Sequence, residues 1–216
     1  MADIKYTVKI VDADSISRNI LDFKGEKKVA LIDFANPVDR AYIGTCVAGD
    51  PAFEGRTYDI NRYNLIIGKD DGMDSADFIA LINQRIKSYP ESPKLPNSIY
   101  VRLIYTDCAY DEPNRGSVEF HTSATSGEEF RKQVREAVKE WIESDFGSYL
   151  HSESSTGRGY LDGLDEDDPD TKQQALDDGA TWDMVYSDLP TALALKHGFL
   201  PMSFTMTLEE NEYDKI

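Results

Sequence analysis

A long amphipathic segment from Ser126 to Phe146 constrains the fold of this chain more than any other stretch. Its apolar residues recur with a period of 3.6 and form one stripe along a helix: Phe130, Val134, Ala137, Val138, Trp141 and Ile142. Ser126 and Glu129 have the spacing of a capping box, which satisfies free backbone N–H groups at a helix start. We therefore predict a helix that packs its apolar face on a β-sheet, with Trp141 in the core.

Short apolar or alternating segments elsewhere predict the strands of this sheet. They cover residues 5–11, 28–34, 41–47, 63–67, 98–106, 117–121 and 202–208. The first alternates cleanly and suits an edge position, whereas residues 98–106 are apolar on both faces and suit a central one. Residues 49–62 contain Gly49, Pro51 and Gly55 and are expected to form a loop.

A second amphipathic helix is predicted for Ser75–Tyr89, with Asp74 or Ser75 as its cap. Prolines at positions 90, 93 and 96 end it and impose an extended connection. Only a short helix is expected near residues 191–196, because Pro190 divides the apolar segment around it. The fold class predicted is α+β: a mixed, mostly antiparallel sheet of five to seven strands, two helices on one face, and long surface connections.

The composition changes after the long helix, and this change sets the domain boundaries that we expect. Residues 1–146 form an α+β core domain, residues 147–180 an acidic excursion flanked by Gly and Ser, and residues 181–216 a C-terminal segment that returns a strand to the core. Between Glu153 and Asp178 nine acidic residues stand against two basic ones, a net charge of −7.

The net charge of the whole chain narrows the classes of partner. Its 216 residues include 40 Asp and Glu but only 23 Lys and Arg, for a formal charge of −17. Such a surface repels phosphate backbones and anionic lipids, so we expect no direct contact with nucleic acid or membrane. The N-terminal stretch lacks the features of a signal peptide, and two cysteines do not form a disulfide framework. We expect the protein in the cytoplasm, where it is made, or in an assembled particle.

Catalytic chemistry has little support in the sequence. Cys108 and His121 share a predicted hairpin, but the expected register places His121 opposite Val101, roughly 16 Å along the strands at ~3.3 Å per residue. Gly68 and Gly72 lack the Lys-Ser/Thr of a phosphate-binding loop. We therefore expect no catalytic residue and no cofactor.

Two clusters of aspartates could supply the oxygen ligands that hard cations prefer. The first contains Asp70, Asp71, Asp74 and Asp77, and the second contains Asp162, Asp165, Asp167, Asp168 and Asp170. Neither has the spacing of a calcium-binding loop, and the first also suits carboxylates at a helix start. We expect no bound metal.

The sequence thus favours a non-enzymatic protein–protein interaction subunit of a larger assembly, of which a virion or tail structural component is one example. Its partner would be another protein or identical subunits in an oligomer. The candidate partner-binding residues are Asp165, Glu166, Asp167, Asp168, Phe53 and Tyr58. Two alternatives stay open. One is an acidic inhibitor that mimics nucleic acid to block a basic groove, and the other is a metal-dependent hydrolase that uses the Asp70 cluster.

Overall fold

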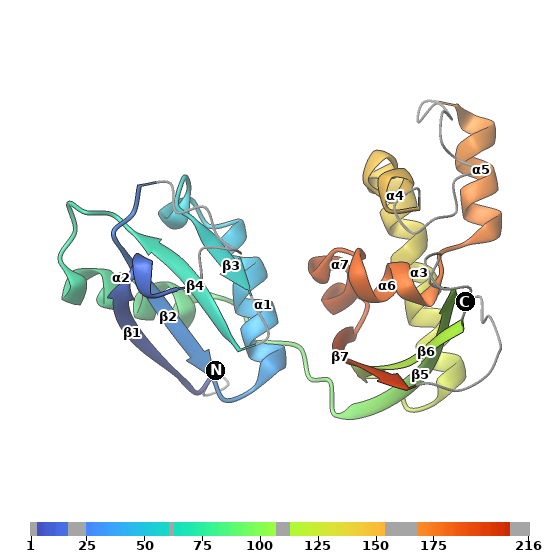
Figure 1. Ribbon diagram of the computed structural model, residues 1–216, viewed down its shortest axis with the longest axis horizontal. Helices are drawn as coiled ribbons and strands as arrows, with labels where there is room; N and C mark the ends of the chain where they lie inside the picture. Colours follow the sequence, from blue (N-terminus) through green and yellow to red (C-terminus); the bar gives the residue numbers. More distant parts are fainter. Residues whose placement is uncertain (1–3, 17–24, 61–62, 107–112, 154–167, 208–216) are drawn as a thin grey trace. The chain divides into compact units, whose positions relative to one another are not determined.

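The computed structural model describes residues 4–16, 25–60, 63–106, 113–153 and 168–207. The chain divides into two compact units, Met1–Pro93 and Lys94–Ile216. Each unit has its own antiparallel sheet and its own helices, so the predicted α+β fold class is confirmed, although its strands form two sheets and not one (Figure 1). The expected boundaries at residues 146 and 180 differ from this division, which falls in the proline-rich stretch after the second predicted helix.

The first unit contains four strands, two α-helices and two short 3₁₀ helices. In chain order these are β1 (Tyr6–Asp12), η1 (Ala13–Ser15), β2 (Lys28–Phe34), α1 (Pro37–Ala48), η2 (Pro51–Phe53), β3 (Tyr58–Ile60), β4 (Asn64–Lys69) and α2 (Ser75–Ser88). The strand order is β1-β2-β4-β3, and all three pairings are antiparallel. Strands predicted at residues 5–11, 28–34 and 63–67 are therefore confirmed, as are the edge position of the first and the helix at residues 75–89.

Helices α1 and α2 cover the same face of this sheet. Alternate residues of the two central strands, including Ile32 and Ile67, lie in one buried cluster with Ile43 of α1 and with Phe78 and Ile82 of α2. The alternation follows from the pleat, which sends successive side chains to opposite faces. On the other face, η1 and the residue after it lie in a smaller cluster that contains Ala13, Ile16, Val29 and Ile66.

Residues 41–47 form part of α1, so the predicted strand at this position is wrong. The Asn36 side chain accepts a hydrogen bond from the Val38 N–H (2.9 Å), and Pro37 occupies the first helical turn. These are the residue types that start helices, because the cap supplies a missing acceptor and proline lacks an N–H that would stay unpaired. Gly44 lets the helix approach β3 closely, since a Cβ there would overlap the Ile60 side chain.

The second unit contains three strands and five helices in the described residues. These are β5 (Asn97–Thr106), β6 (Pro113–Thr122), α3 (Gly127–Ser144), α4 (Phe146–Glu153), α5 (Pro169–Asp178), α6 (Trp182–Ser187), α7 (Thr191–Lys196) and β7 (Phe199–Thr207). The strand order is β5-β6-β7, again antiparallel. Strands predicted at residues 98–106, 117–121 and 202–208 and the short helix at 191–196 are confirmed, but β5 lies at an edge because β7 takes the other side of β6.

Helix α3 supplies most of the core of the second unit. All six residues of the predicted stripe are buried, and Trp141 is 0% exposed. Around Phe130, the Trp182 ring is stacked at 5.8 Å and the Phe199 ring is perpendicular at 5.8 Å, which joins α3 to α6 and β7. Such aromatic pairs stabilise a core beyond the area that they bury. The prediction of a sheet-packed helix is therefore confirmed.

Three further helices lie where none was expected. Helices α4 and α5 occupy the first and last parts of the predicted acidic excursion, and α6 precedes the short helix that was predicted. Capping side chains stand at the starts of α5 and α6: Asp168 accepts from the Asp170 N–H (3.1 Å), and Thr181 accepts from the Met184 N–H (3.4 Å). Within the described ranges, no helix is both long and apolar enough to span a membrane.

Candidate functional site

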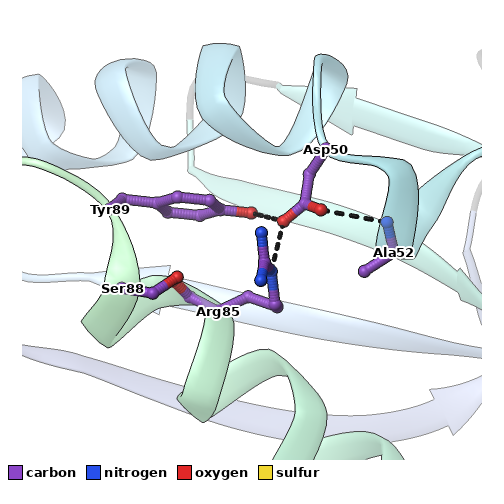
Figure 2. A network of polar contacts seen from close by, with 5 residues as sticks. All are labelled: Asp50, Ala52, Arg85, Ser88 and Tyr89. Atoms are coloured by element: carbon purple, nitrogen blue, oxygen red, sulfur yellow. Dashed lines mark hydrogen bonds and ion pairs between the residues drawn. The ribbon is translucent and has the colours of Figure 1, made fainter.

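Among the ion pairs between described residues of the first unit, the most buried centres on Asp50, whose side chain is 2% exposed. One carboxylate oxygen, Oδ2, accepts hydrogen bonds from Arg85 Nε (2.6 Å) and from the Tyr89 hydroxyl. The other, Oδ1, accepts from the Ala52 N–H (2.9 Å) and so caps η2 (Figure 2). Asp50 follows α1, whereas Arg85 and Tyr89 come from the end of α2. The carboxylate therefore ties the two helices together.

The electrostatics of this contact keep Asp50 ionised. Burial by itself would raise the pKa of the carboxyl, but the hydrogen bonds from Arg85, Tyr89 and Ala52 lower it below its usual range. Burial, followed by the hydrogen bond to Asp50 and its negative charge, raises the pKa of the Tyr89 phenol. Asp50 is thus an anion with three donors around it, which suits a structural clamp better than a general base.

Cys46 lies near this clamp and is a free cysteine. Burial has the largest effect and raises the pKa of its thiol; the hydrogen bond with Tyr42 lowers that pKa, the negative charge of Asp50 raises it, and the hydrogen bond with Thr45 lowers it, so that the thiol pKa is raised on balance. A raised pKa keeps the thiol protonated at neutral pH, whereas nucleophilic cysteines need the thiolate. The surroundings of Cys46 therefore do not activate it.

A second polar cluster joins α3 to α7. Glu140 accepts hydrogen bonds from Lys196 Nζ at 2.6 and 2.8 Å, and its Oε2 lies 2.9 Å from His197 Nε2. The hydrogen bonds from Lys196 and then His197 lower the pKa of the Glu140 carboxyl. This cluster holds the short helix α7 on the long helix α3. Its described contacts are those of a packing contact and not of a reaction centre.

The candidate partner-binding residues have different positions in the structure. Three of them lie outside the described residues: Asp165, Glu166 and Asp167. Asp168 is the cap of α5, and Thr171 donates to its Oδ2 (3.0 Å). Phe53 is 3% exposed and belongs to the core of the first unit, so it offers no surface to a partner here. Tyr58, in contrast, is 46% exposed.

The described aspartates of the two clusters lie at helix starts or in the loop before α2. Asp74 accepts from the Ala76 N–H (2.7 Å) and caps α2, while Asp70 accepts from the Gly72 N–H (2.9 Å). Asp71 forms an ion pair with Lys27 at 3.2 Å. Among the described residues, no group of three or more His, Cys, Asp or Glu side chains could hold a metal ion.

The hairpin β5–β6 has a different register from the one expected. His121 pairs with Ser98 and not with Val101, and Thr106 pairs with Pro113. His121 Nε2 lies 3.6 Å from Glu119 Oε1 on the same strand. Cys108 lies outside the described residues, so the expectation that these two side chains do not form a catalytic pair stays a prediction.

A groove of about 480 Å³ separates α3 from α5 in the second unit. Its floor is apolar and includes Val138, Ile142 and Leu176, whereas charged side chains such as Arg135 and Asp178 stand at its rim. This size and this mixture of apolar floor and a few polar groups are usual for ligand sites.

Among the side chains whose burial the structure describes, three large hydrophobic ones are exposed, and all three are tyrosines. Tyr58 is 46% exposed, Tyr63 is 73% exposed and Tyr100 is 69% exposed. Tyr58 lies on β3 and Tyr63 directly precedes β4, so both belong to the hairpin that these two strands form. Tyr100 lies on β5. Each of the two sheets therefore has an exposed tyrosine on a strand at its edge.

Known proteins add no further assignment. No family model, curated protein or solved structure matches this chain. The features that distinguish the molecule are therefore those of its own geometry, namely the Asp50 clamp, the groove between α3 and α5 and the three exposed tyrosines.

Sequence reasoning had identified Tyr58 but neither the clamp nor the groove. One local signal for the clamp was present: Asp50 precedes Pro51, which is the order of a cap followed by a first helical residue. Its partners on α2 lie 35 and 39 residues away, and no local pattern connects them to Asp50. The groove has no sequence signal of its own, because it depends on how α3 and α5 lie against each other.

Proposed function

We propose that this protein is a non-enzymatic interaction subunit that binds a protein partner through exposed tyrosines at the edges of its sheets. One observation carries the proposal: where the structure describes side-chain burial, the exposed large hydrophobic side chains are all tyrosines, and two of them lie on edge strands. Tyrosine is enriched at protein interfaces because its ring buries a large apolar area while its hydroxyl keeps a polar contact.

The geometry of β3 supports a role for Tyr58. The Gly68 N–H donates to the Thr57 carbonyl at 2.7 Å, and Tyr58 pairs with Ile67. In an antiparallel ladder this places Tyr58 in a non-hydrogen-bonded pair, so its own N–H and carbonyl point away from β4. The edge at Tyr58 therefore offers a partner both an aromatic ring and backbone hydrogen-bonding groups.

Tyr100 supports a comparable role for the second unit. Ile99 and Val101, its neighbours on β5, pack against the core, so the alternation of the strand sends Tyr100 to the opposite face. It pairs with Glu119 of β6, whose negative charge and hydrogen bond raise the pKa of the Tyr100 phenol. An aromatic ring next to a carboxylate suits a partner that combines apolar and basic groups.

The net charge of −17 supports the choice of a basic partner surface. Complementary charge speeds association and disfavours acidic competitors. It does not favour the mimicry of nucleic acid, because the longest helix mixes signs: Lys132 pairs with Glu136 and Lys139 with Glu143. In the Asp70 cluster, Asp70 and Asp74 accept hydrogen bonds from backbone N–H groups and Asp71 pairs with Lys27, so no observation favours the hydrolase.

The proposal is tested by site-specific photocrosslinking followed by affinity measurement. A benzophenone amino acid replaces Tyr58, Tyr63 or Tyr100 in the full chain, and Lys132, on the solvated face of α3, serves as the control position. We expect the tyrosine positions, and not position 132, to crosslink the same protein in the native source. That protein is then purified, and its dissociation constant is measured against wild type.

Substitution separates a true interface from incidental proximity. Tyr58→Ser, Tyr63→Ser and Tyr100→Ser leave the cores intact, so the thermal midpoint should stay close to that of wild type. Loss of an interface anchor typically costs 2 kcal/mol or more, so at least one variant should bind about 30-fold more weakly. If the crosslinked protein binds all three variants and wild type with equal affinity, the tyrosines are not the interface and the proposal fails.

A further inference from the structure

The groove between α3 and α5 is built from two facing stripes of side chains. On α3 the lining residues are Arg135, Val138, Lys139, Ile142 and Glu143, which recur at intervals of one helical turn. On α5 and the residues after it they are Gln173, Leu176, Asp177, Asp178, Gly179 and Ala180. Spacings of three and four residues place side chains on one face of a helix, so each helix presents a continuous wall.

Contacts at both ends of α5 fix these walls. At its start, Lys172 Nζ donates to the Glu143 carbonyl at 3.3 Å and lies 5.7 Å from the centre of the Phe146 ring. After its end, the Gly179 carbonyl accepts from the Tyr149 hydroxyl at 3.2 Å. The start of α5 therefore meets the end of α3, and α5 is anchored both at its start and just after its end.

The rim charges of the groove differ from one wall to the other. Arg135, Lys139 and the carboxylate of Glu143 stand on the α3 wall, whereas the charged residues of the α5 wall, Asp177 and Asp178, are both acidic. Lys139 pairs with Glu143 (3.8 Å), and Asp177 accepts from Gln173 (2.9 Å). Arg135 and Asp178 form no ion pair with any residue in the described part of the chain. Two opposite charges thus line one apolar groove without meeting each other.

From this arrangement we propose that the groove is a binding site for a short zwitterionic peptide. The carboxylate of the peptide meets Arg135, its apolar side chains cover Val138, Ile142 and Leu176, and its ammonium group meets Asp178. A guanidinium binds carboxylate in a planar, two-pronged geometry, which suits a free C-terminus. A groove of 480 Å³ suits a ligand of a few residues. The peptide is either free or the C-terminal end of another chain.

The test uses the tripeptide Lys-Leu-Leu with a free C-terminus, titrated into the full-length protein. Amide chemical shifts of Gly179 and Ala180 report on the groove, and calorimetry gives the dissociation constant. We expect saturable shifts at these two amides. The C-terminal amide of the same peptide lacks the anion, and Ac-Gln-Leu-Leu lacks the cations. Each should bind wild type about tenfold more weakly or worse, which corresponds to about 1.4 kcal/mol.

Matched variants assign each charge to its residue. Arg135→Gln should bind the free acid and the amide equally, whereas Asp178→Asn should bind the lysine and the acetyl-glutamine peptides equally. Lys132→Gln is the control, because Lys132 pairs with Glu136 (3.9 Å) outside the groove and its loss should change nothing. To separate the two sources of the ligand, the same tripeptide is fused to the C-terminus of an inert carrier protein. Retained affinity assigns the groove to chain ends, and lost affinity assigns it to free peptides.

Three results would overturn the proposal. They are an absence of saturable shifts up to about 10 mM peptide, equal affinity of wild type for the acid and the amide, and an unchanged preference for the acid in Arg135→Gln. The groove contains none of the three exposed tyrosines. A failure here therefore leaves the crosslinking test of the interaction surface unaffected, and the converse also holds.

Discussion

Removal of the Asp50 carboxylate should destabilise the first unit selectively. Asp50→Ala deprives the Ala52 N–H and the Tyr89 hydroxyl of their acceptor. Loss of a cap costs ~0.5–2 kcal/mol, and a hydroxyl left without its partner costs ~1–3 kcal/mol when it is fully buried, so the partly buried Tyr89 hydroxyl contributes toward the lower end of that range. The Arg85 side chain is partly exposed, so water can hydrate it in the variant, and its lost ion pair adds no further free-energy cost. We expect a loss of about 2–4 kcal/mol in the free energy of unfolding.

Hydrogen–deuterium exchange measures this loss in each unit separately. Amides in the central strands β2 and β4 report on the first unit, and those in β6 report on the second. A loss of 2–4 kcal/mol corresponds to exchange about 30- to 900-fold faster in β2 and β4. Glu54→Ala is the matched control, because it removes an exposed carboxylate from the same loop and should change the stability by less than ~0.5 kcal/mol.

Acid gives an independent check of the same carboxylate. Its folded pKa is lowered, so its contribution is complete above the unfolded pKa of about 3.9 and is lost as the pH falls through the folded value. Asp50→Asn should therefore make the stability of the first unit less dependent on pH below about pH 4. If exchange in β2 and β4 is the same in Asp50→Ala and wild type, the carboxylate does not clamp α1 to α2 and the reasoning fails.

Three further outcomes follow from the geometry. Trp141→Ala should lower the stability of the second unit by ~3–5 kcal/mol, since its ring is fully buried; an unchanged thermal midpoint would contradict this packing. Gly198→Ala should lower the free energy of unfolding by ~1–3 kcal/mol, because φ is 85° and a Cβ would lie 2.5 Å from Ser123 Oγ. Urea denaturation measures this loss. Gly49→Ala is the control, since a Cβ at Gly49 has open space around it. The pKa of the Tyr89 phenol is raised, so its stabilising effect is present below about pH 10 and is lost at higher pH. In ultraviolet titration, wild type and Tyr89→Phe should therefore show the same phenolate absorbance below about pH 10. A difference there would refute the prediction.

The helices α2 and α3 could be predicted because each has a local cause. Their apolar stripes repeat at the helical period, and capping side chains stand at their starts. Three other helices begin with a capping side chain followed by proline, a local signal that the sequence analysis did not use. The pairs are Asn36-Pro37, Asp50-Pro51 and Asp168-Pro169, and in each the side chain before proline accepts a backbone hydrogen bond. Residues 41–47 were assigned to a strand because a buried helix is apolar on most sides and loses its visible period.

The pairing of strands and the candidate site could not be predicted in the same way. Alternation in β5 identifies a strand, but its position at an edge is decided by β7, which comes from the far end of the chain. The groove depends likewise on contacts between distant residues, such as Lys172 with Phe146. Tyr58 could be named as a candidate because an aromatic residue in a polar segment is a local feature, and its role in binding stays a prediction, while the burial of Phe53 depends on the helices packed around it.

The pairing of β7 with β6 also sets the order in which the chain can fold. The first unit has all of its strands by Lys69 and its last helix by Ser88. The sheet of the second unit is complete only after residues 123–198 have been made, because its third strand begins at Phe199. Contacts between residues so far apart form slowly, and domains fold as units during synthesis, the N-terminal one first. A nascent chain therefore carries a folded first unit while α3 still exposes the apolar stripe that Phe199 will cover.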